Sequence, residues 1–373
     1  MIFIAVDVGT TNIDMAFLNT DKDCDFYQKS FHNRQSLYGS DVINRINTVK
    51  RDKSFIAKLK ELAVSDILAA IDEYLSVNNC DANDITKLCL SGNTTMISLL
   101  LEYDVSKMGE SPYPTVLDKT VIKNSRELFG KECRFDCDVI LTGCVSAFIG
   151  GDILSGLIFL DKFNSFLDKK KVNLLIDLGT NGEMVLNNKG KLLAASAACG
   201  PAFEASLKIQ GVYGASGISA LVALINSGKL SKDGCLSDEY IENGIRVHNI
   251  LITSDIIREI LLAKAAIASC IESLYKKAGI DYDVTDNVYI SGGFGSFLKI
   301  DDAVMLGIIP KAFGEKAHQT GNTSLRGAEQ ILIDDKLIDK ADLLSEQIEV
   351  LLLADEDGYN ESLINNMFFT MVI

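Results

Sequence analysis

The sequence predicts an α/β protein with two lobes, each organised around a hairpin of strand, turn and strand. The same pattern of Asp, an apolar residue, Gly and Thr stands at residues 7–10 (DVGT) and at residues 177–180 (DLGT), 170 positions later, with apolar segments on both sides. A repeat over this distance is typical of two related lobes rather than of a short-period solenoid. The length of 373 residues supports the division, because it exceeds what one compact core usually holds.

Composition limits the partners and the compartment. The chain is 47% hydrophobic and 23% charged, as expected for a globular protein, and it carries a net charge of −15. We expect no nucleic acid and no anionic membrane surface as partner, because both attract basic proteins. Apolar runs too short to span a membrane and the lack of a charged leader favour a cytoplasmic location. The oligomeric state stays open, with a homodimer among the alternatives.

The two hairpins suit a phosphate ligand and its metal. Asp7 and Asp177 each end a predicted buried strand, where a carboxylate can hold Mg²⁺ directly or through water. The turn that follows offers backbone N–H groups, so two such turns facing one another would bind a polyphosphate and its Mg²⁺ from both sides. The turn residues expected at the phosphates are Gly9, Thr10, Thr11, Asn12, Gly179, Thr180, Asn181 and Gly182. The alternative is that these residues only close two unrelated turns.

The first lobe is predicted over residues 1–168. Within it, segment 33–54 is polar and predicted irregular, and apolar residues at helical spacing predict a helix over 65–77. A strand over 85–91 ends in GNTT at residues 92–95. This polar stretch either directs amide and hydroxyl groups to a ligand or caps the helix that follows.

A segment rich in small residues, 146–156, is predicted to be helical and contains a single acid, Asp152. Its glycines would let another helix or backbone approach closely, as a crossing between the lobes would need. Asp152 is therefore a candidate to orient an attacking water. The alternative is a solvated or capping carboxylate.

The second lobe is predicted over residues 169–325. Gly200 stands at a predicted helix entry that could seat a phosphate or ribose on unpaired N–H groups. Thr253 or Ser254 is predicted to cap a long helix, which Gly279 closes. Lys264, within that helix, could reach a nucleotide or lie at the surface.

A predicted strand over 288–291 leads into a glycine-rich turn, SGGFG. Glycines at such a turn let a flat adenine lie on the backbone where a Cβ would collide. The candidate adenine-binding residues are Gly292, Gly293, Phe294 and Gly295. The remaining residues, 326–373, are predicted to form a returning helix, a last strand over 348–353 and a helix over 361–368.

Nine cysteines give a weak indication of a metal site. Only Cys133, Cys137 and Cys144 are clustered, and their spacing is wider than zinc and iron–sulfur sites normally show. The others are scattered, mostly within apolar runs where Cys acts as a small hydrophobe. We therefore expect reduced thiols and no iron–sulfur cluster in this chain.

The order of these motifs resembles the five-part pattern of the acetate and sugar kinase, heat-shock protein and actin superfamily. More closely, the chain resembles the ATP-binding part of the reductive activators of corrinoid-dependent methyltransfer proteins. The matching stretches, spread over nearly the whole chain, are IAVDVGTTN, SGNTTM, LLIDLGTNGE, GPAFE, LAKAAI, SGGFG and TGNTSLRGA. The resemblance implies a two-lobed actin-like ATPase fold, in which each lobe is a ribonuclease-H-like mixed sheet with flanking helices and the nucleotide cleft lies between the lobes.

The resemblance also implies an activity. Members of that family use ATP hydrolysis to lift an electron onto a Co(II) corrinoid, which yields Co(I), and carry an iron–sulfur domain for that electron. ATP and Mg²⁺ are then the expected cofactors, Asp7, Asp177 and Asp152 the catalytic candidates, and a corrinoid protein the partner. Because no cluster motif is present, we expect a separate electron donor. The alternatives are a small-molecule kinase of the same superfamily and a non-catalytic nucleotide-binding regulator.

Overall fold

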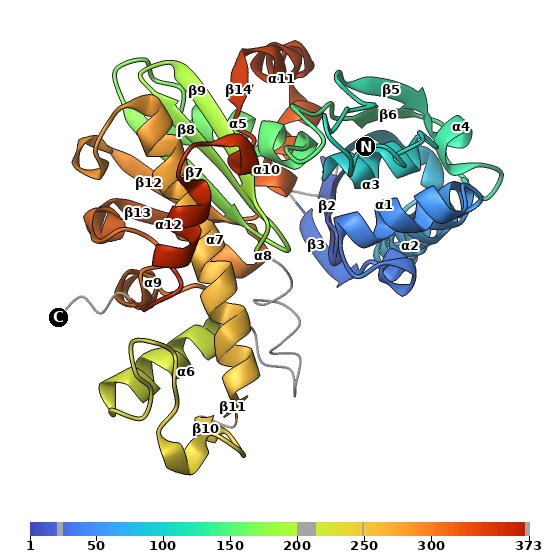
Figure 1. Cartoon of the computed structure of the whole chain (residues 1–373). Helices are drawn as coiled ribbons and strands as arrows, with labels where there is room; N and C mark the ends of the chain where they lie inside the picture. The colour runs from blue at the N-terminus through green and yellow to red at the C-terminus, as the bar shows by residue number, and fades with distance from the viewer. Residues whose placement is uncertain (21–24, 200–213, 248–249, 370–373) are drawn as a thin grey trace. The chain divides into compact units, whose positions relative to one another are not determined.

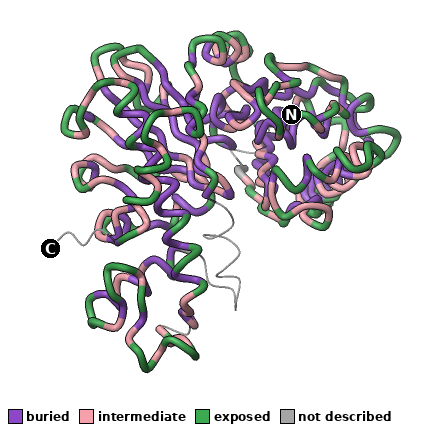
Figure 2. Tube along the Cα trace, in the orientation of Figure 1, coloured by how far each residue is buried: buried purple, intermediate pink, exposed green. Residues whose placement is uncertain are grey.

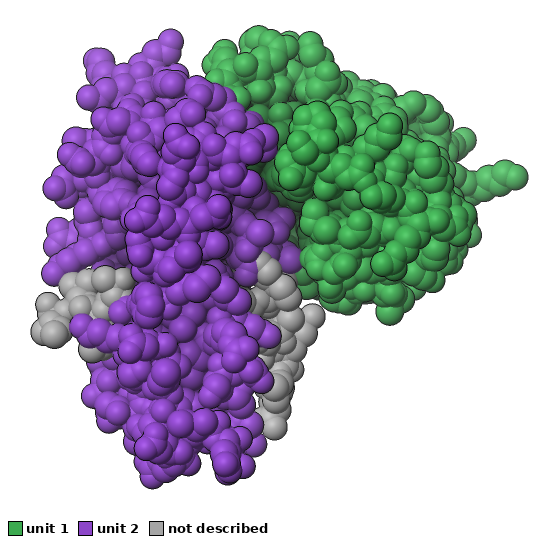
Figure 3. Space-filling model, in the orientation of Figure 1, with its two compact units in different colours: residues 1–165, 323–348 green, residues 166–322, 349–373 purple. Residues whose placement is uncertain are grey.

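A computed structural model describes residues 1–20, 25–199, 214–247 and 250–369 (Figure 1). The chain forms two compact units, which Figure 3 distinguishes by colour: unit 1 comprises residues 1–165 and 323–348, and unit 2 comprises residues 166–322 and 349–373. The predicted lobes, 1–168 and 169–325, place the first boundary three residues later. The predicted third segment, 326–373, is divided between the units, because residues up to 348 belong to unit 1 and residues from 349 belong to unit 2.

Unit 1 contains a six-stranded sheet in the order β3-β2-β1-β4-β6-β5. The strands are Ile2–Val8 (β1), Asn12–Asn19 (β2), Asp25–His32 (β3), Ile85–Gly92 (β4), Val121–Asn124 (β5) and Asp138–Leu141 (β6). Strand β1 pairs antiparallel with β2 and parallel with β4, so the predicted hairpin lies in the middle of the sheet.

Helices cover this sheet and connect its strands (Figure 1). They are Val42–Arg51 (α1), Phe55–Asn78 (α2), Thr94–Leu100 (α3), Ser125–Phe129 (α4), Gly151–Asn164 (α5), Thr323–Ile333 (α10) and Lys336–Gln347 (α11), with 3₁₀ turns at Arg34–Tyr38 (η1) and Ala82–Asp84 (η2). Helices α10 and α11 come from the far end of the sequence, so unit 1 is discontinuous along the chain.

The prediction of an irregular segment over 33–54 is wrong, because η1 and α1 lie there. Helix α1 is short and polar, but the Asp41 side chain caps it by accepting from Asn44 N at 2.8 Å. Val42, Ile46 and Val49 bury one face of the helix. The next helix, α2, begins at Phe55 rather than near Ser65, because Leu59, Ala63 and Val64 extend its buried stripe toward the N-terminus.

Unit 2 contains a second six-stranded sheet, in the order β13-β12-β7-β8-β9-β14, and a small hairpin, β10-β11. The strands are Val172–Leu178 (β7), Gly182–Asn188 (β8), Lys191–Ala197 (β9), Ile245–Val247 (β10), Ile250–Ile252 (β11), Asn287–Ser291 (β12), Ala317–Gly321 (β13) and Ile348–Val350 (β14). The order β9-β8-β7-β12-β13 repeats the order β3-β2-β1-β4-β6, with the same strand directions. The predicted α/β fold with two related sheets is confirmed.

The helices of unit 2 are Gly214–Asn226 (α6), Ser254–Ala278 (α7), Gly292–Gly295 (α8), Ile300–Leu306 (α9) and Tyr359–Asn365 (α12), with 3₁₀ turns at Asp238–Tyr240 (η4), Tyr282–Val284 (η5), Lys311–Lys316 (η6) and Leu353–Asp355 (η7). Thr253 caps α7 through its side chain, and Gly279 ends it in the left-handed conformation, with φ of 66°. Both predictions for the ends of this helix are confirmed.

Each unit has its own apolar core, which Figure 2 shows as buried segments along the central strands. In unit 1, Ile2, Ile4, Val6 and Val8 of β1 are fully buried. In unit 2, five consecutive residues from Val172 to Ile176 are buried, because both faces of the sheet are covered. No helix in the described part of the chain is long and apolar enough to cross a membrane.

The two glycine-rich helices, α5 and α10, pack against one another within unit 1. At Gly327 of α10, a Cβ atom would lie 1.8 Å from the carbonyl oxygen of Ser155 in α5. At Gly156 of α5, a Cβ atom would lie 2.9 Å from Thr323 Oγ1. The glycines therefore allow backbone contact between the helices. The sequence predicts a close approach for segment 146–156, but as a crossing between the lobes, whereas this contact lies within unit 1.

Candidate functional site

The first candidate half-site is built on the hairpin of β1 and β2. Asp7 precedes the last residue of β1, and its antiparallel partner in β2 is Asp14. Directly paired residues of antiparallel strands project from the same face of the sheet, so the hairpin carries two carboxylates on one face. On the other side of β1, Asp7 pairs with Ser91, near the end of β4.

Three serine hydroxyl groups, each from a different element, form a chain of close contacts that begins at Asp7. Ser324 Oγ, in the first turn of α10, donates to Asp7 Oδ1 at 2.8 Å. It also lies 3.1 Å from Ser91 Oγ, which is 2.9 Å from Ser155 Oγ in α5. The orientation of the Asp7 carboxylate is thus tied to the pair of crossing helices.

The predicted ligand-binding residues in the turn after Asp7 differ in their exposure to solvent. Thr10 is buried, Thr11 is half-buried and Asn12 is exposed. A Cβ atom at Gly9 would lie 2.7 Å from Asn12 O, so glycine is needed for the turn to close this tightly. Of the predicted side chains, Thr11 and Asn12 are the ones accessible to a ligand.

Asp152 lies at the start of α5, where its Oδ1 accepts from Ile153 N at 2.8 Å. A Cβ atom at Gly150, just before it, would lie 2.7 Å from Asp152 Oδ1 and 2.8 Å from Thr94 N. Asp152 therefore stands beside the first turn of α3. It lies in the first turn of α5, whose N-cap is Gly150, and a role in orienting an attacking water stays a prediction.

The GNTT stretch between β4 and α3 has structural roles. Asn93 caps α3, because its Oδ1 accepts from Thr95 N at 3.0 Å. Thr94 Oγ1 donates to Ser146 O at 2.8 Å. Of the two predicted alternatives, the structure shows the helix cap.

The second candidate half-site is the hairpin of β7 and β8. Asp177 pairs antiparallel with Glu183 of β8 and parallel with Ser291 of β12. Ser291 Oγ donates to Asp177 Oδ2 at 2.6 Å. Desolvation in the protein raises the pKa of Asp177, and the hydrogen bond from Ser291 partly opposes that rise.

Within the second turn, Thr180 is buried, Asn181 is half-buried and Gly182 is buried. Gly179 N donates to Asn181 O at 2.9 Å, which closes the turn. A Cβ atom at Gly182 would lie 2.9 Å from Cys199 Sγ. Gly200 lies outside the described residues.

The glycine-rich turn after β12 forms the short helix α8. Gly292 has φ of 87°, and a Cβ atom there would lie 2.4 Å from Leu178 O and 2.6 Å from Asp177 Oδ1. Gly293 is exposed, and a Cβ atom there would meet nothing within 4 Å, whereas Phe294 and Gly295 are buried. Gly292 thus brings the turn against the hairpin, Phe294 belongs to the core, and Gly293 is the exposed position.

The half-sites repeat more than the Asp-Gly-Thr turn. Each has an acid on the second strand (Asp14 or Glu183) and a serine on the neighbouring parallel strand (Ser91 or Ser291). In each, the glycine after that serine contacts the hairpin backbone, since a Cβ atom at Gly92 would lie 2.5 Å from Val8 O. Sequence reasoning did not single out the two acids on the second strands or the two serines. For the serines, the LSG of residues 90–92 and the ISG of residues 290–292, which lie 200 positions apart, could have indicated them.

Family comparisons agree with this architecture. Residues 2–163 match the family described as the RACo middle region, and residues 171–227 and 206–372 match the C-terminal domain of RACo, the ASKHA domain. The chain belongs to the RACo family.

Two relatives of the chain are named for corrinoid chemistry. The corrinoid activation enzyme RamQ of Eubacterium limosum is 25% identical over 425 residues, covering 98% of this chain and 70% of the relative. The [Co(II) methylated amine-specific corrinoid protein] reductase of Methanosarcina barkeri is 23% identical over 363 residues, covering 81% of this chain and 66% of the relative. The chain thus spans about two thirds of the length of these relatives.

A solved structure matches the whole RACo-family chain. It is a reductive activator for corrinoid, iron–sulfur protein, which is 25% identical and superimposes with a TM-score of 0.87. The match covers 100% of this chain and 67% of that protein. The fold of the acetate and sugar kinase, heat-shock protein and actin (ASKHA) superfamily, which the sequence implied, is therefore confirmed.

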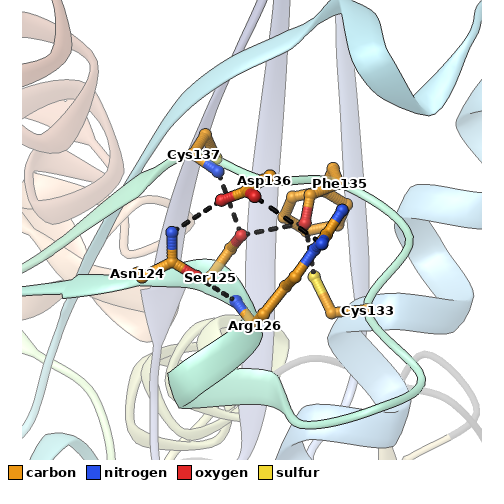
Figure 4. Close-up of polar contacts among 7 residues, drawn as sticks. All are labelled: Asn124, Ser125, Arg126, Cys133, Phe135, Asp136 and Cys137. Atoms are coloured by element: carbon orange, nitrogen blue, oxygen red, sulfur yellow. Dashed lines mark hydrogen bonds and ion pairs between the residues drawn. The ribbon is translucent and has the colours of Figure 1, made fainter.

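Cys133 and Cys137 belong to a loop held by polar contacts (Figure 4). Cys133 Sγ donates to Phe135 O at 3.3 Å, and Ser125 Oγ bridges Phe135 O and Cys137 N at 3.0 and 3.1 Å. Burial raises the pKa of Cys137 to about 12 and that of Cys144 to about 11. Both thiols are then protonated at neutral pH when no metal ion is bound.

Among the residues that the structure describes, no three His, Cys, Asp or Glu side chains are grouped so as to hold a metal ion. The absence of an iron–sulfur cluster from this chain stays a prediction. Iron analysis after anaerobic reconstitution tests it, with a stoichiometric, bleachable spectrum as the contradicting result.

Lys264 neither lies at the surface nor reaches out toward a ligand. It is fully buried in α7, and its Nζ donates to the carbonyl oxygens of Asn366 and Phe368 at 2.9 and 2.8 Å. Burial lowers the pKa of Lys264 to about 8, while Glu272 opposes that shift. Lys264 therefore anchors the end of the chain, beyond α12, on α7.

Proposed function

We propose that this chain is a Mg²⁺-dependent ATPase that takes part in the reductive reactivation of a corrinoid protein. The observation that carries the nucleotide part is the duplicated arrangement of Asp, turn, serine and glycine in the two units. Membership of the RACo family and the names of the relatives support a corrinoid protein as partner. The cytoplasm is the proposed compartment, because it keeps thiols reduced.

The residues at the two hairpins fit a hydrated Mg²⁺ ion. Mg²⁺ prefers oxygen ligands, keeps several waters and usually takes one or two carboxylates together with phosphate oxygens. Asp7 and Asp177 are the proposed ligands, and Asp14 and Glu183 add negative charge on the same faces. When bound, the metal ion neutralises charge on the phosphates during transfer.

The surrounding groups have proposed roles in binding and orientation. Ser324 and Ser291 hold the carboxylates of Asp7 and Asp177 in fixed orientations through the hydrogen bonds described above. Backbone N–H groups of the turns are proposed to contact phosphate oxygens, and the exposed Gly293 to lie against the base. Asp152 is proposed to orient the water that attacks the γ-phosphorus.

The proposed reaction couples two balanced events. ATP and water give ADP and inorganic phosphate, while one electron from a separate carrier reduces Co(II) of the corrinoid to Co(I). A corrinoid partner that prefers the hydrolysing conformation would raise ATP turnover, by no more than its differential affinity for that conformation. A shift from about 1% to mostly competent molecules needs a few kcal/mol, which one protein interface can supply.

The test is phosphate release with and without a candidate corrinoid protein, in its Co(II) and Co(I) states. We expect slow release alone and faster release with the Co(II) protein, both lost in Asp177→Asn. Turnover that ignores the corrinoid protein but responds to a small metabolite would favour the kinase alternative. Nucleotide binding without any phosphate release would favour the regulator.

A further inference from the structure

In the turn of residues 9–12, three consecutive backbone carbonyl groups accept hydrogen bonds from donors that lie on one side of the turn. Asn33 Nδ2 donates to Gly9 O at 2.9 Å, and Asn33 N donates to Thr11 O at 2.8 Å. Between them, Arg45 Nη2 donates to Thr10 O at 2.5 Å. Asn33 and Arg45 are neighbours, because both donate to Gln35 Oε1, at 3.1 and 3.2 Å.

The direction of these carbonyls fixes the direction of the amides. In a planar trans peptide, the N–H group points opposite to the carbonyl of the preceding residue. The N–H groups of Thr10, Thr11 and Asn12 are therefore turned away from Asn33 and Arg45. Successive N–H groups that point the same way form a concave site for an anion such as phosphate.

Arg45 is unusual because its guanidinium is completely buried. Besides Thr10 O, it donates to Gly39 O at 3.0 Å and lies 2.8 Å from Met96 Sδ. Burial lowers its pKa to about 10, with Asp41 opposing the shift, so the side chain stays charged at neutral pH. Burying a charge whose direct partners are neutral groups is costly, which calls for a role beyond filling the core.

We propose that Arg45 is a positioning residue for phosphate binding: it locks the turn of residues 9–12 with its N–H groups outward and places a positive charge behind them. Because its side chain is 0% exposed, it acts through the turn and does not touch the ligand. In a chain with a net charge of −15, a buried cation near this turn also offsets repulsion of an anionic ligand. The inference rests on the proposed function.

The test compares Arg45→Met with Arg34→Met in the full-length chain. Arg34 is half exposed and pairs with Asp66 of α2 at 2.6 Å, so its variant controls for loss of an arginine in the same region. Titration calorimetry measures the affinities for Mg-ATP and for AMP. We expect Arg45→Met to lose about tenfold in ATP affinity, with little change in AMP affinity, and Arg34→Met to match wild type.

A second readout does not need a ligand. Hydrogen exchange of nucleotide-free protein should be faster in a peptide spanning residues 8–16 of Arg45→Met, and unchanged in a peptide spanning 178–186. A role confined to stability would instead raise exchange throughout unit 1 and lower ATP and AMP affinity in parallel. That result, or ATP affinity within twofold of wild type, overturns the inference.

A third variant covers the case in which Arg45→Met does not fold. Asn33→Ser keeps a side-chain oxygen to accept from Gln35 N, as Asn33 does at 3.0 Å, but lacks the donor to Gly9 O. It should show the same selective loss of ATP affinity. Wild-type protein that binds no Mg-nucleotide would reject the proposed function itself, whereas wild-type binding with unaffected variants rejects only the role of Arg45 and Asn33.

Discussion

Ser291 Oγ donates to Asp177 Oδ2 across a distance of 2.6 Å, joining the ends of two neighbouring parallel strands. The hydroxyl stabilises the charged carboxylate, while burial destabilises it, and the pKa of Asp177 rises because burial is the larger effect. A positive ligand at this point would remove the penalty. Under the proposed function, this balance would favour binding of a cation at Asp177.

Asp177→Asn should abolish nucleotide-induced stabilisation. At one hundred times the dissociation constant, a ligand adds about 2.7 kcal/mol to the free energy of unfolding, or roughly 5–10 °C in melting temperature for a domain of this size. We expect such a shift with Mg-ADP in wild type, none in Asp177→Asn, and a smaller one in Ser291→Ala. Asp286→Asn is the matched control, since Asp286 Oδ2 accepts from Val172 N at the opposite end of β7. An equal shift in all four proteins would contradict the role of Asp177.

The raised pKa of Asp177 predicts a pH dependence of stability without ligand. Between the unfolded pKa, about 3.9, and the higher folded pKa, the folded chain binds more protons than the unfolded chain. The free energy of unfolding therefore falls as pH rises through this window and stays lower above it. Asp177→Asn should melt like wild type near pH 4 and at a higher temperature at pH 7. The idea fails if melting curves show no gain for the variant at pH 7.

Two glycine substitutions should separate packing from binding. Gly327→Ala forces a Cβ atom to within 1.8 Å of Ser155 O, and overpacking of this kind typically costs about 1–3 kcal/mol or more. Gly293→Ala meets nothing within 4 Å, so it should leave the empty protein stable but lower nucleotide affinity if the base lies there. Chemical denaturation and nucleotide titration of both variants provide the measurements. A nucleotide affinity of Gly293→Ala equal to that of wild type would place the base elsewhere.

Lys264→Met should release the end of the chain. The substitution removes two part-buried hydrogen bonds, which the charged Nζ donates to the carbonyl oxygens of Asn366 and Phe368, at a cost of about 1–3 kcal/mol. Limited proteolysis should then cleave after α12 faster than in wild type. Lys276→Met is the control, because Lys276, on the same helix, binds Asp357 O from an exposed position. Equal cleavage rates for the two variants would argue against the anchoring role.

The sequence predicted what depends on local pattern. The hairpins of Asp7 and Asp177 follow from apolar strands around an Asp-Gly turn, and the ends of α7 follow from Thr253 and Gly279. The same reasoning missed α1, whose buried stripe is short and separated by polar residues. The local pattern around Arg45 predicts an exposed arginine. Its burial follows from contacts with η1 and with the hairpin turn, which lie elsewhere in the sequence.

Contacts between distant segments could not be predicted in this way. Ser324 lies 317 residues from Asp7, and nothing in its neighbourhood marks it as a partner of that carboxylate. Lys264 fits a surface position by charge alone, and only the return of residues 366–368 shows that it is buried. These roles depend on which distant segments the fold brings together, and the local sequence pattern around each residue does not indicate that.

The return of α10 to unit 1 has a consequence for synthesis on the ribosome. Asp7 emerges 317 residues before Ser324, which at about 5–20 residues per second is a delay of roughly 15 to 60 s. Between the synthesis of α5 and that of α10, the surface of α5 around Ser155 lacks α10, and β7, β12 and β13 are all made within that time. The half-site around Asp7 is therefore completed only after most of unit 2 has been synthesised.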